Sequence, residues 1–421
     1  MDIFFERTEA GIPVIVDNSS KDTAVFMTAV GTGSRDEDER IGGISHLLEH
    51  VVFRATRTRS SFQMSKEIEG AGGELNAFTS KEMTAFYAAT IRETSGVAKE
   101  MVADVFMNPL ILPVDTELEK KIVLQEISMW ENDPESYIHS ILAETLWNGH
   151  PLAKNEAGRS EVVSSMTSDD LRKYYEERYV RPNIAVFAAG AVDPQETVQW
   201  VNEMFDNMNA GNKIIRSGPG RIRPEYKAVQ RKGDHVYTGI GFRAYPADHK
   251  DIPALSVLNT VLGAGMSSRL FQNVREEKAL VYSIYSTVEQ NSDAGSLAAY
   301  MSSTEENVTE AIDITMSTIR KFKEEGMTDG EMQRAKNLIK GATARQLEST
   351  SMKVYRMARR FMLTGVAEPI GKSIEKIDSV TENDVMRVAE DVLKNDNLAL
   401  AIYGPKNKAL KKIGIDQFDL N

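Results

Sequence analysis

The sequence predicts an α+β fold of two similar tandem domains, each a mostly antiparallel β-sheet packed with helices. The chain has 421 residues, more than one ordinary hydrophobic core accommodates. Short strand-like runs alternate with long helical patterns. A helix–strand unit near the middle of the chain also returns near its end with the same internal spacing, which indicates a duplicated domain.

The repeated unit begins at a threonine and ends at a glycine. Thr167 opens the first copy and the apolar run 183–190 follows; Thr381 opens the second, followed by the run 397–404. Thr-x-x-Asp is typical of a capped helix start, and each apolar run indicates a strand. We therefore predict domains at residues 1–208 and 223–421, joined by a linker at 209–222. Two unrelated helix–strand units are the alternative.

The first half contains further elements with clear limits. Strands are expected at 14–16 and 24–30, a helix at 60–70 that Gly70-Ala71-Gly72-Gly73 ends, and strands at 74–79 and 83–90. Helical patterns then extend over 94–107 and 115–130. An earlier helix carries the segment 46–50, and Ser45 is a candidate to help start it.

The segment His46-Leu47-Leu48-Glu49-His50 holds the clearest chemical signal. Residues four apart on a helix lie about 40° apart around its axis, so His46 and His50 share one face and can bind one zinc ion. Glu49 leans over the same edge, where a carboxylate can act as a general base. The order H-x-x-E-H is a metallopeptidase signature. Two solvated histidines are the alternative, but the apolar neighbours argue against it, because burying histidines and a glutamate needs a reason.

Two histidines leave a catalytic zinc site incomplete, since three protein ligands are usual. The helical segment 115–130 offers Glu119 and Glu126, which are seven residues apart and share one face. One of them could bind the metal while the other orients water or a histidine. By spacing alone, two solvated glutamates are an equal possibility.

Composition narrows the class of protein. The chain carries a net charge of −12, which disfavours nucleic acid and anionic membranes as partners. It has no cysteine, so a zinc site must use histidine, carboxylate and water. The N-terminal residues lack a signal-peptide pattern and no window suits a membrane span, so we expect a cytoplasmic protein.

The run HLLEHVVFRATRTRSS and the later run EIEGAGGELNAFTSKEMTAFYA closely resemble the N-terminal signature of the pitrilysin family of zinc peptidases, which includes insulin-degrading enzyme and the mitochondrial processing peptidase. The resemblance covers nearly the whole chain. It implies one Zn²⁺ per chain, with Glu126 as the third ligand and Glu119 as a further essential glutamate.

The resemblance also implies substrate contacts. A peptide is expected to add as a strand beside Asn76, Ala77 and Phe78, and Phe53 and Phe78 are candidates for an apolar pocket, with a core role as the alternative. In the second half, Arg275 and Tyr282 have the spacing of the family's substrate-clamping pair and could stabilise an oxyanion. A surface arginine and a core tyrosine are the alternative.

Together these features predict a zinc endopeptidase that cleaves peptides or unfolded segments in a closed chamber. Larger relatives join four such domains, so this two-domain chain is expected to form a homodimer in which Arg275 and Tyr282 act on the partner's zinc site. The second half has only His235 and His249, not spaced as a pair, so it would support or cover the site. The alternatives are a non-catalytic scaffold, like core subunits of the mitochondrial respiratory reductase, and one half of a hetero-oligomeric peptidase.

Overall fold

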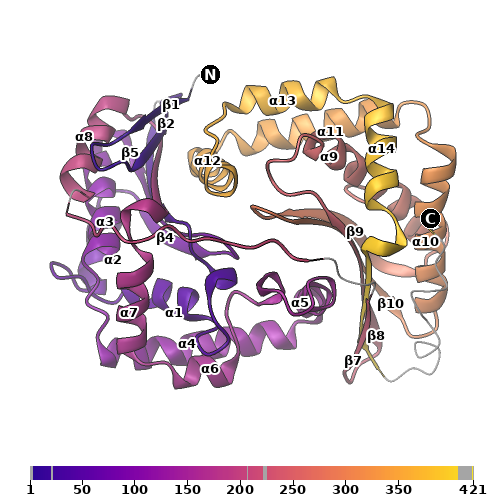
Figure 1. Cartoon of the computed structure of the whole chain (residues 1–421), viewed down its shortest axis with the longest axis horizontal. Coiled ribbons are helices and arrows are strands. Elements are labelled where there is room, and N and C mark those ends of the chain that lie inside the picture. The colour runs from indigo at the N-terminus through magenta and orange to yellow at the C-terminus, as the bar shows by residue number, and fades with distance from the viewer. Residues whose placement is uncertain (1–2, 20–21, 206, 221–224, 406–419, 421) are drawn as a thin grey trace. The chain divides into compact units, whose positions relative to one another are not determined.

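The chain folds into two compact units, each assembled from three stretches of sequence (Figure 1). The computed structural model describes residues 3–19, 22–205, 207–220, 225–405 and 420. Unit 1 comprises Met1–Ser128, Lys154–Arg216 and Ala344–Gly371, and unit 2 comprises Met129–Ala153, Ser217–Thr343 and Lys372–Asn421. Each unit contains one sheet packed with helices, which confirms the predicted α+β class.

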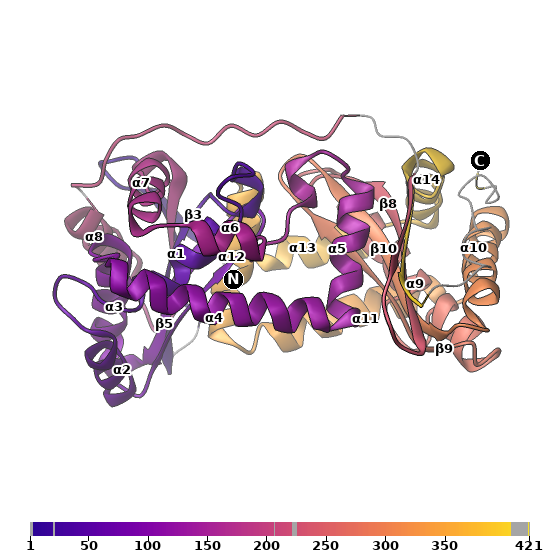
Figure 2. The ribbon, with the colours of Figure 1, turned by 90° about the horizontal axis from the view of Figure 1, so that it is seen from below.

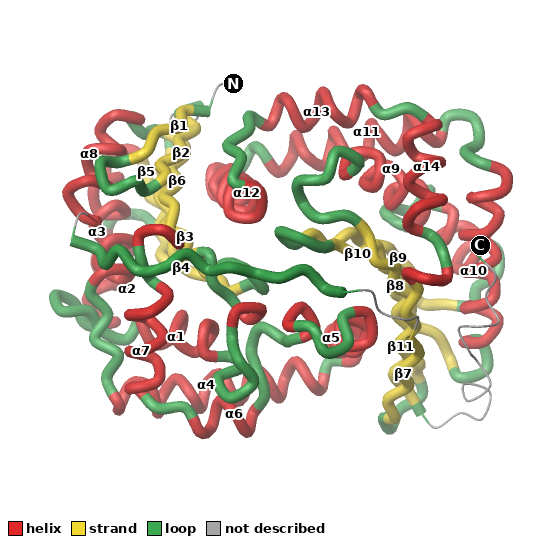
Figure 3. The backbone as a smooth tube through the Cα atoms, in the orientation of Figure 1, coloured by secondary structure: helices red, strands yellow, loops and turns green. Residues whose placement is uncertain are grey.

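Unit 1 is built on a six-stranded sheet in the order β1-β2-β6-β3-β5-β4. Its strands are drawn in yellow in Figure 3. The strands are β1 (Phe4–Arg7), β2 (Pro13–Asp17), β3 (Thr23–Val30), β4 (Glu74–Thr79), β5 (Thr84–Ile91) and β6 (Ile184–Gly190). Neighbouring strands are antiparallel except β2 and β6, which are parallel. Because β4 is at the edge, its outer backbone edge has no strand neighbour within the described sheet.

Both faces of this sheet are covered, which explains why its central strands carry apolar side chains on both faces. Along β3, Phe26 enters one core while Val25 and Met27 enter the other, because successive side chains of a strand point to opposite faces. The first core is covered by α1 (Ile44–Val52), α2 (Ser61–Gly70), α3 (Ser95–Met107), α4 (Pro113–Asn132), α6 (Ser160–Ser165), α7 (Ser168–Arg178) and α8 (Pro194–Phe205). The second core is covered by α12 (Thr350–Thr364).

Unit 2 contains a five-stranded sheet in the order β7-β11-β8-β10-β9. The strands are β7 (Glu225–Gln230), β8 (His235–Ala244), β9 (Val281–Gln290), β10 (Gly295–Thr304) and β11 (Leu398–Gly404). One face packs on a core that includes residues of α9 (Ile252–Leu262), α10 (Val308–Glu325), α11 (Glu331–Gln346) and α14 (Glu382–Val392). The other face packs against α5 (Pro134–Leu146), which lies beside β8 and β10 in Figure 2. Helix α13 (Ile370–Ser379) precedes α14.

The predicted repeat is visible in both units. Thr167 caps α7 and Thr381 caps α14, each through a capping box with the aspartate three residues later. The strands that follow, β6 and β11, each pair in parallel with a strand from earlier in their half, β2 and β7 respectively. The same local sequence therefore builds the same helix–strand unit twice.

The packing units do not follow the two halves of the chain, because each unit includes a helix from the other half. In unit 2, α5 packs on the sheet where Gly239 and Gly241 leave room for Leu142; a Cβ on Gly239 would lie 3.1 Å from that side chain. In unit 1, α12 packs on the sheet, and the hydroxyls of Thr23 and Thr350 are 2.7 Å apart. The predicted linker at 209–222 concerns where one sequence repeat ends and the next begins, and it remains a prediction.

The predicted linker is anchored to unit 1 by one of its side chains. Arg216 donates to both carboxylate oxygens of Asp36, at 2.8 and 2.7 Å, and to the carbonyl of Gly31 at 2.8 Å. Residues 221 and 222 of the predicted linker lie outside the described residues. Within the described part of the chain, every helix is too short or too polar to cross a bilayer.

Candidate metal centre

The motif helix α1 begins where two stretches of backbone pass very close together. Gly43 caps it with φ of +96°, a left-handed conformation that favours glycine, and a Cβ there would lie 2.5 Å from the carbonyl oxygen of Ala157. Leu47, Leu48 and Val51 on one face of α1 are buried in the core. His46, Glu49 and His50 are consequently held, partly buried, on another face.

A buried carboxylate fixes the start of this helix. Glu37 accepts hydrogen bonds from the backbone N–H groups of Gly43 at 2.7 Å and Ser45 at 2.9 Å. Burial raises the pKa of Glu37 to about 7, against the lowering effect of these bonds. Ser45 lies within α1 and is not its cap residue, which is Gly43. The hydroxyls of Ser45 and Tyr174 form a hydrogen bond of 2.8 Å. The sequence patterns gave Glu37 no role at the site; its position six residues before Gly43 is the only local signal for this contact.

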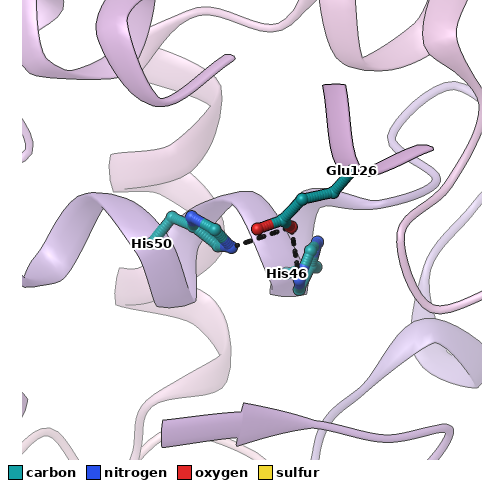
Figure 4. Close-up of side chains that lie close together, drawn as sticks. All are labelled: His46, His50 and Glu126. Atoms are coloured by element: carbon teal, nitrogen blue, oxygen red, sulfur yellow. Dashed lines mark ion pairs between the residues drawn. The ribbon is translucent and has the colours of Figure 1, made fainter. Parts of the chain in front are cut away.

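Three side chains converge beside α1. Nε2 of His46 and Nε2 of His50 lie 3.7 and 3.4 Å from the same Oε2 atom of Glu126, which reaches them from α4 (Figure 4). One possible ligand atom from each residue lies within 4.8 Å of the others. Among the described residues this is the group with the composition and closeness of a metal site.

This geometry fits zinc. Four ligands in a tetrahedron at about 2.0–2.2 Å from Zn²⁺ are roughly 3.3–3.6 Å from one another, close to the observed separations. Two histidines and one glutamate are the donor set of catalytic zinc sites that keep a fourth position for water. Burial, and secondarily the charge of His50, lowers the pKa of His46 to about 4, so its imidazole is neutral near pH 7 and can act as a ligand.

Glu119 has a different place from Glu126. Its Oε2 lies 3.1 Å from Nδ1 of His50, so Nδ1–H can donate to the carboxylate while Nε2 points toward Glu126. A carboxylate that accepts the second ring proton fixes the tautomer and the orientation of a metal-binding histidine. By contrast, Nδ1 of His46 is buried with no hydrogen-bond partner in the described structure. Sequence spacing left open which of the two glutamates is the candidate ligand. In the structure, Glu126 approaches both histidines, whereas Glu119 contacts Nδ1 of His50.

Glu49 is tied to the edge strand of the sheet. The hydroxyl of Thr79, the last residue of β4, donates to Oε2 of Glu49 at 2.6 Å. Burial raises the pKa of Glu49, while this hydrogen bond acts in the opposite direction. The carboxylate also interacts electrostatically with His50 and Glu126. The candidate general base, the candidate ligands and β4 therefore belong to one local cluster in unit 1.

The predicted substrate-binding residues divide between the two faces of β4. Ala77 packs toward the core beneath α1, as does Phe53, whose ring is 6.1 Å from that of Phe86. Phe78 lies on the opposite face, with its ring 5.3 Å from that of Tyr355 in α12. The exposed Asn76 shares that second face by alternation. The structure thus places Ala77 and Phe53 on the side of the sheet that faces α1, and Phe78 on the opposite side.

Arg275 and Tyr282 belong to unit 2. Arg275 lies in a short helical segment, Phe271–Glu276, with its guanidinium 4.7 Å from the centre of the Phe271 ring. Tyr282 is in β9 and 77% of its surface is exposed, so it is not a core tyrosine. Their approach to a zinc site stays a prediction.

Comparisons with known proteins identify the family of the chain. Residues 13–159 match the family model described as Insulinase (Peptidase family M16), and residues 165–339 match the one described as Peptidase M16 inactive domain. An uncharacterized zinc protease of Mycobacterium tuberculosis is 34% identical over 381 residues, covering 89% of this chain and 87% of its own. The chain belongs to the M16 family of peptidases. The resemblance seen in the sequence is thereby confirmed.

Other relatives align with this M16 chain over a similar or larger share of its length. The uncharacterized zinc protease YmxG of Bacillus subtilis is 31% identical over 396 residues, covering 94% of this chain and 96% of its own. A protease from Helicobacter pylori superposes with a TM-score of 0.88 at 20% identity, covering 96% of this chain and 100% of its own. A peptidase M16 inactive domain from Pseudomonas fluorescens gives 0.89 at 16% identity, covering 96% and 98%. The two solved structures support the two-unit fold.

Proposed function

We propose that this M16 chain is a zinc-dependent endopeptidase that hydrolyses peptides or unfolded polypeptide segments. The observation that carries the proposal is the convergence of His46, His50 and Glu126 on one point beside Glu49. A solvated helix face would not need a buried glutamate from a second helix behind one of its histidines. One zinc ion per chain would be held by these three side chains.

Each residue of the cluster has a defined task in this proposal. When bound, zinc supplies a water of lowered pKa and polarises the scissile carbonyl. Glu49 accepts the proton of the attacking water and returns it to the leaving amine. Glu119 orients His50, and Thr79 holds the carboxylate of Glu49 in place. Arg275 and Tyr282 are proposed to contact the substrate and stabilise the developing oxyanion.

Substrate binding is proposed to use the edge strand β4. Its outer backbone edge has no strand partner among the described residues, and an extended peptide could pair with it through main-chain hydrogen bonds. Main-chain pairing gives affinity with little side-chain selectivity, which suits broad specificity. Folded proteins would be excluded if the site works inside a closed chamber formed by a homodimer. A cytoplasmic location stays a prediction, testable by cell fractionation.

The test compares peptide cleavage and zinc content of the wild-type chain with those of Glu49→Gln. We expect the variant to keep its zinc, because Glu49 is not among the proposed ligands, and to lose turnover by a factor of at least about 10² to 10⁴. Glu69→Gln, on the exposed surface of α2, is the matched control and should cleave like the wild type.

Two results would contradict parts of the proposal. Full turnover in Glu49→Gln would remove the general-base role. A wild-type chain that holds zinc but cleaves no member of a broad peptide library would favour the alternatives, a non-catalytic scaffold or one half of a hetero-oligomeric peptidase. Addition of candidate partner subunits to the same assay would distinguish those two.

A further inference from the structure

An arginine just beyond the metal helix reaches the glutamate that supports His50. Arg54 follows the end of α1 and lies four residues after His50. Its Nη1 is 3.5 Å from Oε1 of Glu119, and its Nε is 3.7 Å from Oδ1 of Asp115. Asp115 and Glu119 lie one turn apart on α4, so a single guanidinium spans both carboxylates.

The two oxygens of Glu119 therefore have two different partners. Oε2 faces Nδ1 of His50 and Oε1 faces Arg54. Only 7% of the Glu119 side chain is exposed. A carboxylate so buried is costly without an opposite charge, and once paired it has little freedom to rotate.

We propose that Arg54 is a positioning residue for the metal centre. It holds the Glu119 carboxylate so that Oε2 accepts the Nδ1–H of His50, and His50 then presents Nε2 to the metal. The inference rests on the proposed zinc site. Because Nδ1 of His46 lacks such support in the described structure, the chain Arg54–Glu119–His50 is the device that orients an imidazole here.

The placement of Arg54 differs from that of an ordinary surface arginine. About a third of its side chain, 34%, is exposed, and its Nε is buried without a hydrogen-bond partner among the described residues. A free arginine would turn that group to water, whereas here it faces Asp115. A lysine carries one compact charge and cannot span two carboxylates as a planar guanidinium does. Arg54→Lys should therefore keep only part of the positioning effect of the arginine.

The test measures zinc binding directly, by competition with a chelator and by the rate of zinc release from the full chain. Arg54→Met keeps the apolar stem and should weaken zinc binding about 10- to 100-fold, mainly through faster release. Arg54→Lys should fall between Arg54→Met and the wild type. Arg57→Met removes the same charge from an exposed arginine three residues later and should stay within about twofold of the wild type.

Further measurements separate positioning from a loss of folding. Replacing zinc with Co²⁺ and recording the visible spectrum reports the ligand geometry, and Arg54→Met should change it while the far-ultraviolet circular dichroism stays that of the wild type. In a Glu119→Gln background, Arg54→Met should add little further loss, because both residues act through the same hydrogen bond. Additive losses would show that Arg54 does not act through Glu119.

The outcomes distinguish this inference from the proposed function. Unchanged zinc affinity and release in Arg54→Met would overturn the positioning role and leave the peptidase proposal standing. If neither the wild type nor Arg57→Met binds one zinc per chain, the proposed zinc site itself fails. If Arg54→Met does not fold, Arg54→Lys and Arg54→Gln provide the same comparison.

Discussion

At the scale of single residues, the hydrogen bond from Thr79 to Glu49 joins the metal helix to the strand proposed to bind substrate. Its 2.6 Å length is that of a hydroxyl donating to a carboxylate. A general base must be held within hydrogen-bond reach of the proton that it takes, and Glu49 has several rotatable bonds. Thr79 restricts that freedom from an element that the substrate itself would contact.

Thr79→Val should therefore lower kcat by about tenfold or more and leave zinc content unchanged, since valine keeps the shape of threonine and removes the donor. The measurement is kcat and KM for one peptide together with zinc per chain. Thr58→Val, a change of the same kind at a threonine that bonds Asp104 instead, is the control. Loss of zinc in Thr79→Val would contradict the assignment of Thr79 to the base alone.

At the scale of elements, the start of α1 depends on Glu37. The first N–H groups of a helix have no partner within the helix, and here a buried carboxylate satisfies two such groups around Gly43 and Ser45. The backbone carbonyl of Glu37 also accepts a hydrogen bond from Nζ of Lys154. The helix that carries both histidines is thus fixed at its N-terminal end by a titratable group outside the metal cluster.

This carboxyl should make stability depend on pH. Burial raises the pKa of Glu37 from 4.5 to about 7, so the folded state holds its proton more tightly than the unfolded chain does. The resulting stability is fully present below pH 4.5 and is lost as pH rises through 7, a difference of up to ~3 kcal/mol. Glu37→Gln cannot titrate and lacks this dependence.

The measurement is urea unfolding at pH 4.5 and pH 7.5 with excess chelator, followed by the fluorescence of Trp200, which lies in unit 1. Trp130 and Trp147, both in unit 2, are replaced by phenylalanine in every variant compared. The unfolding free energy of the wild type minus that of Glu37→Gln should fall by up to ~3 kcal/mol from pH 4.5 to pH 7.5. An equal difference at both pH values would show that Glu37 does not titrate in this range.

At the scale of the whole molecule, the chain places the candidate ligands in unit 1 and the candidate substrate contacts Arg275 and Tyr282 in unit 2. Each unit also uses one helix from the other half of the chain, α5 or α12, to cover a face of its sheet. Neither half of the sequence by itself therefore contains a completely covered sheet. We expect separately expressed halves to fold poorly for this reason.

The proposed homodimer predicts complementation between two inactive chains. If Tyr282 acts on the partner's zinc site, a mixed dimer of Glu49→Gln and Tyr282→Phe contains one site with both native residues. Co-refolding equal amounts should then restore roughly a quarter of wild-type activity, because half of the dimers are mixed and each has one active site of two. No recovery in mixed dimers, isolated by two different affinity tags, would mean that Tyr282 acts within its own chain or not at all.

The sequence by itself determined the features that short windows encode. The i, i+4 histidine pair, the threonine caps and the apolar periodicities each depend on a few neighbouring residues, so the repeat and the elements that these patterns mark were predictable, whereas helices such as α5, α6 and α8 had no prediction. The helix expected at 115–130 extends two residues further at each end in the structure, over Pro113–Asn132, with Pro113 in its first turn. The family signature extended this to Glu126 and Glu119 through their spacing.

Only the tertiary structure decided the features that join residues far apart in the chain. It grouped Glu126 with the two histidines and set Glu119 behind His50. It turned Phe78 away from α1 and placed Glu37 at the start of that helix. It also packed α5, from the first half of the chain, in unit 2, and α12, from the second half, in unit 1. Burial, pairing of charges and the coverage of sheet faces are properties of the packed molecule, so local periodicity could not reveal them.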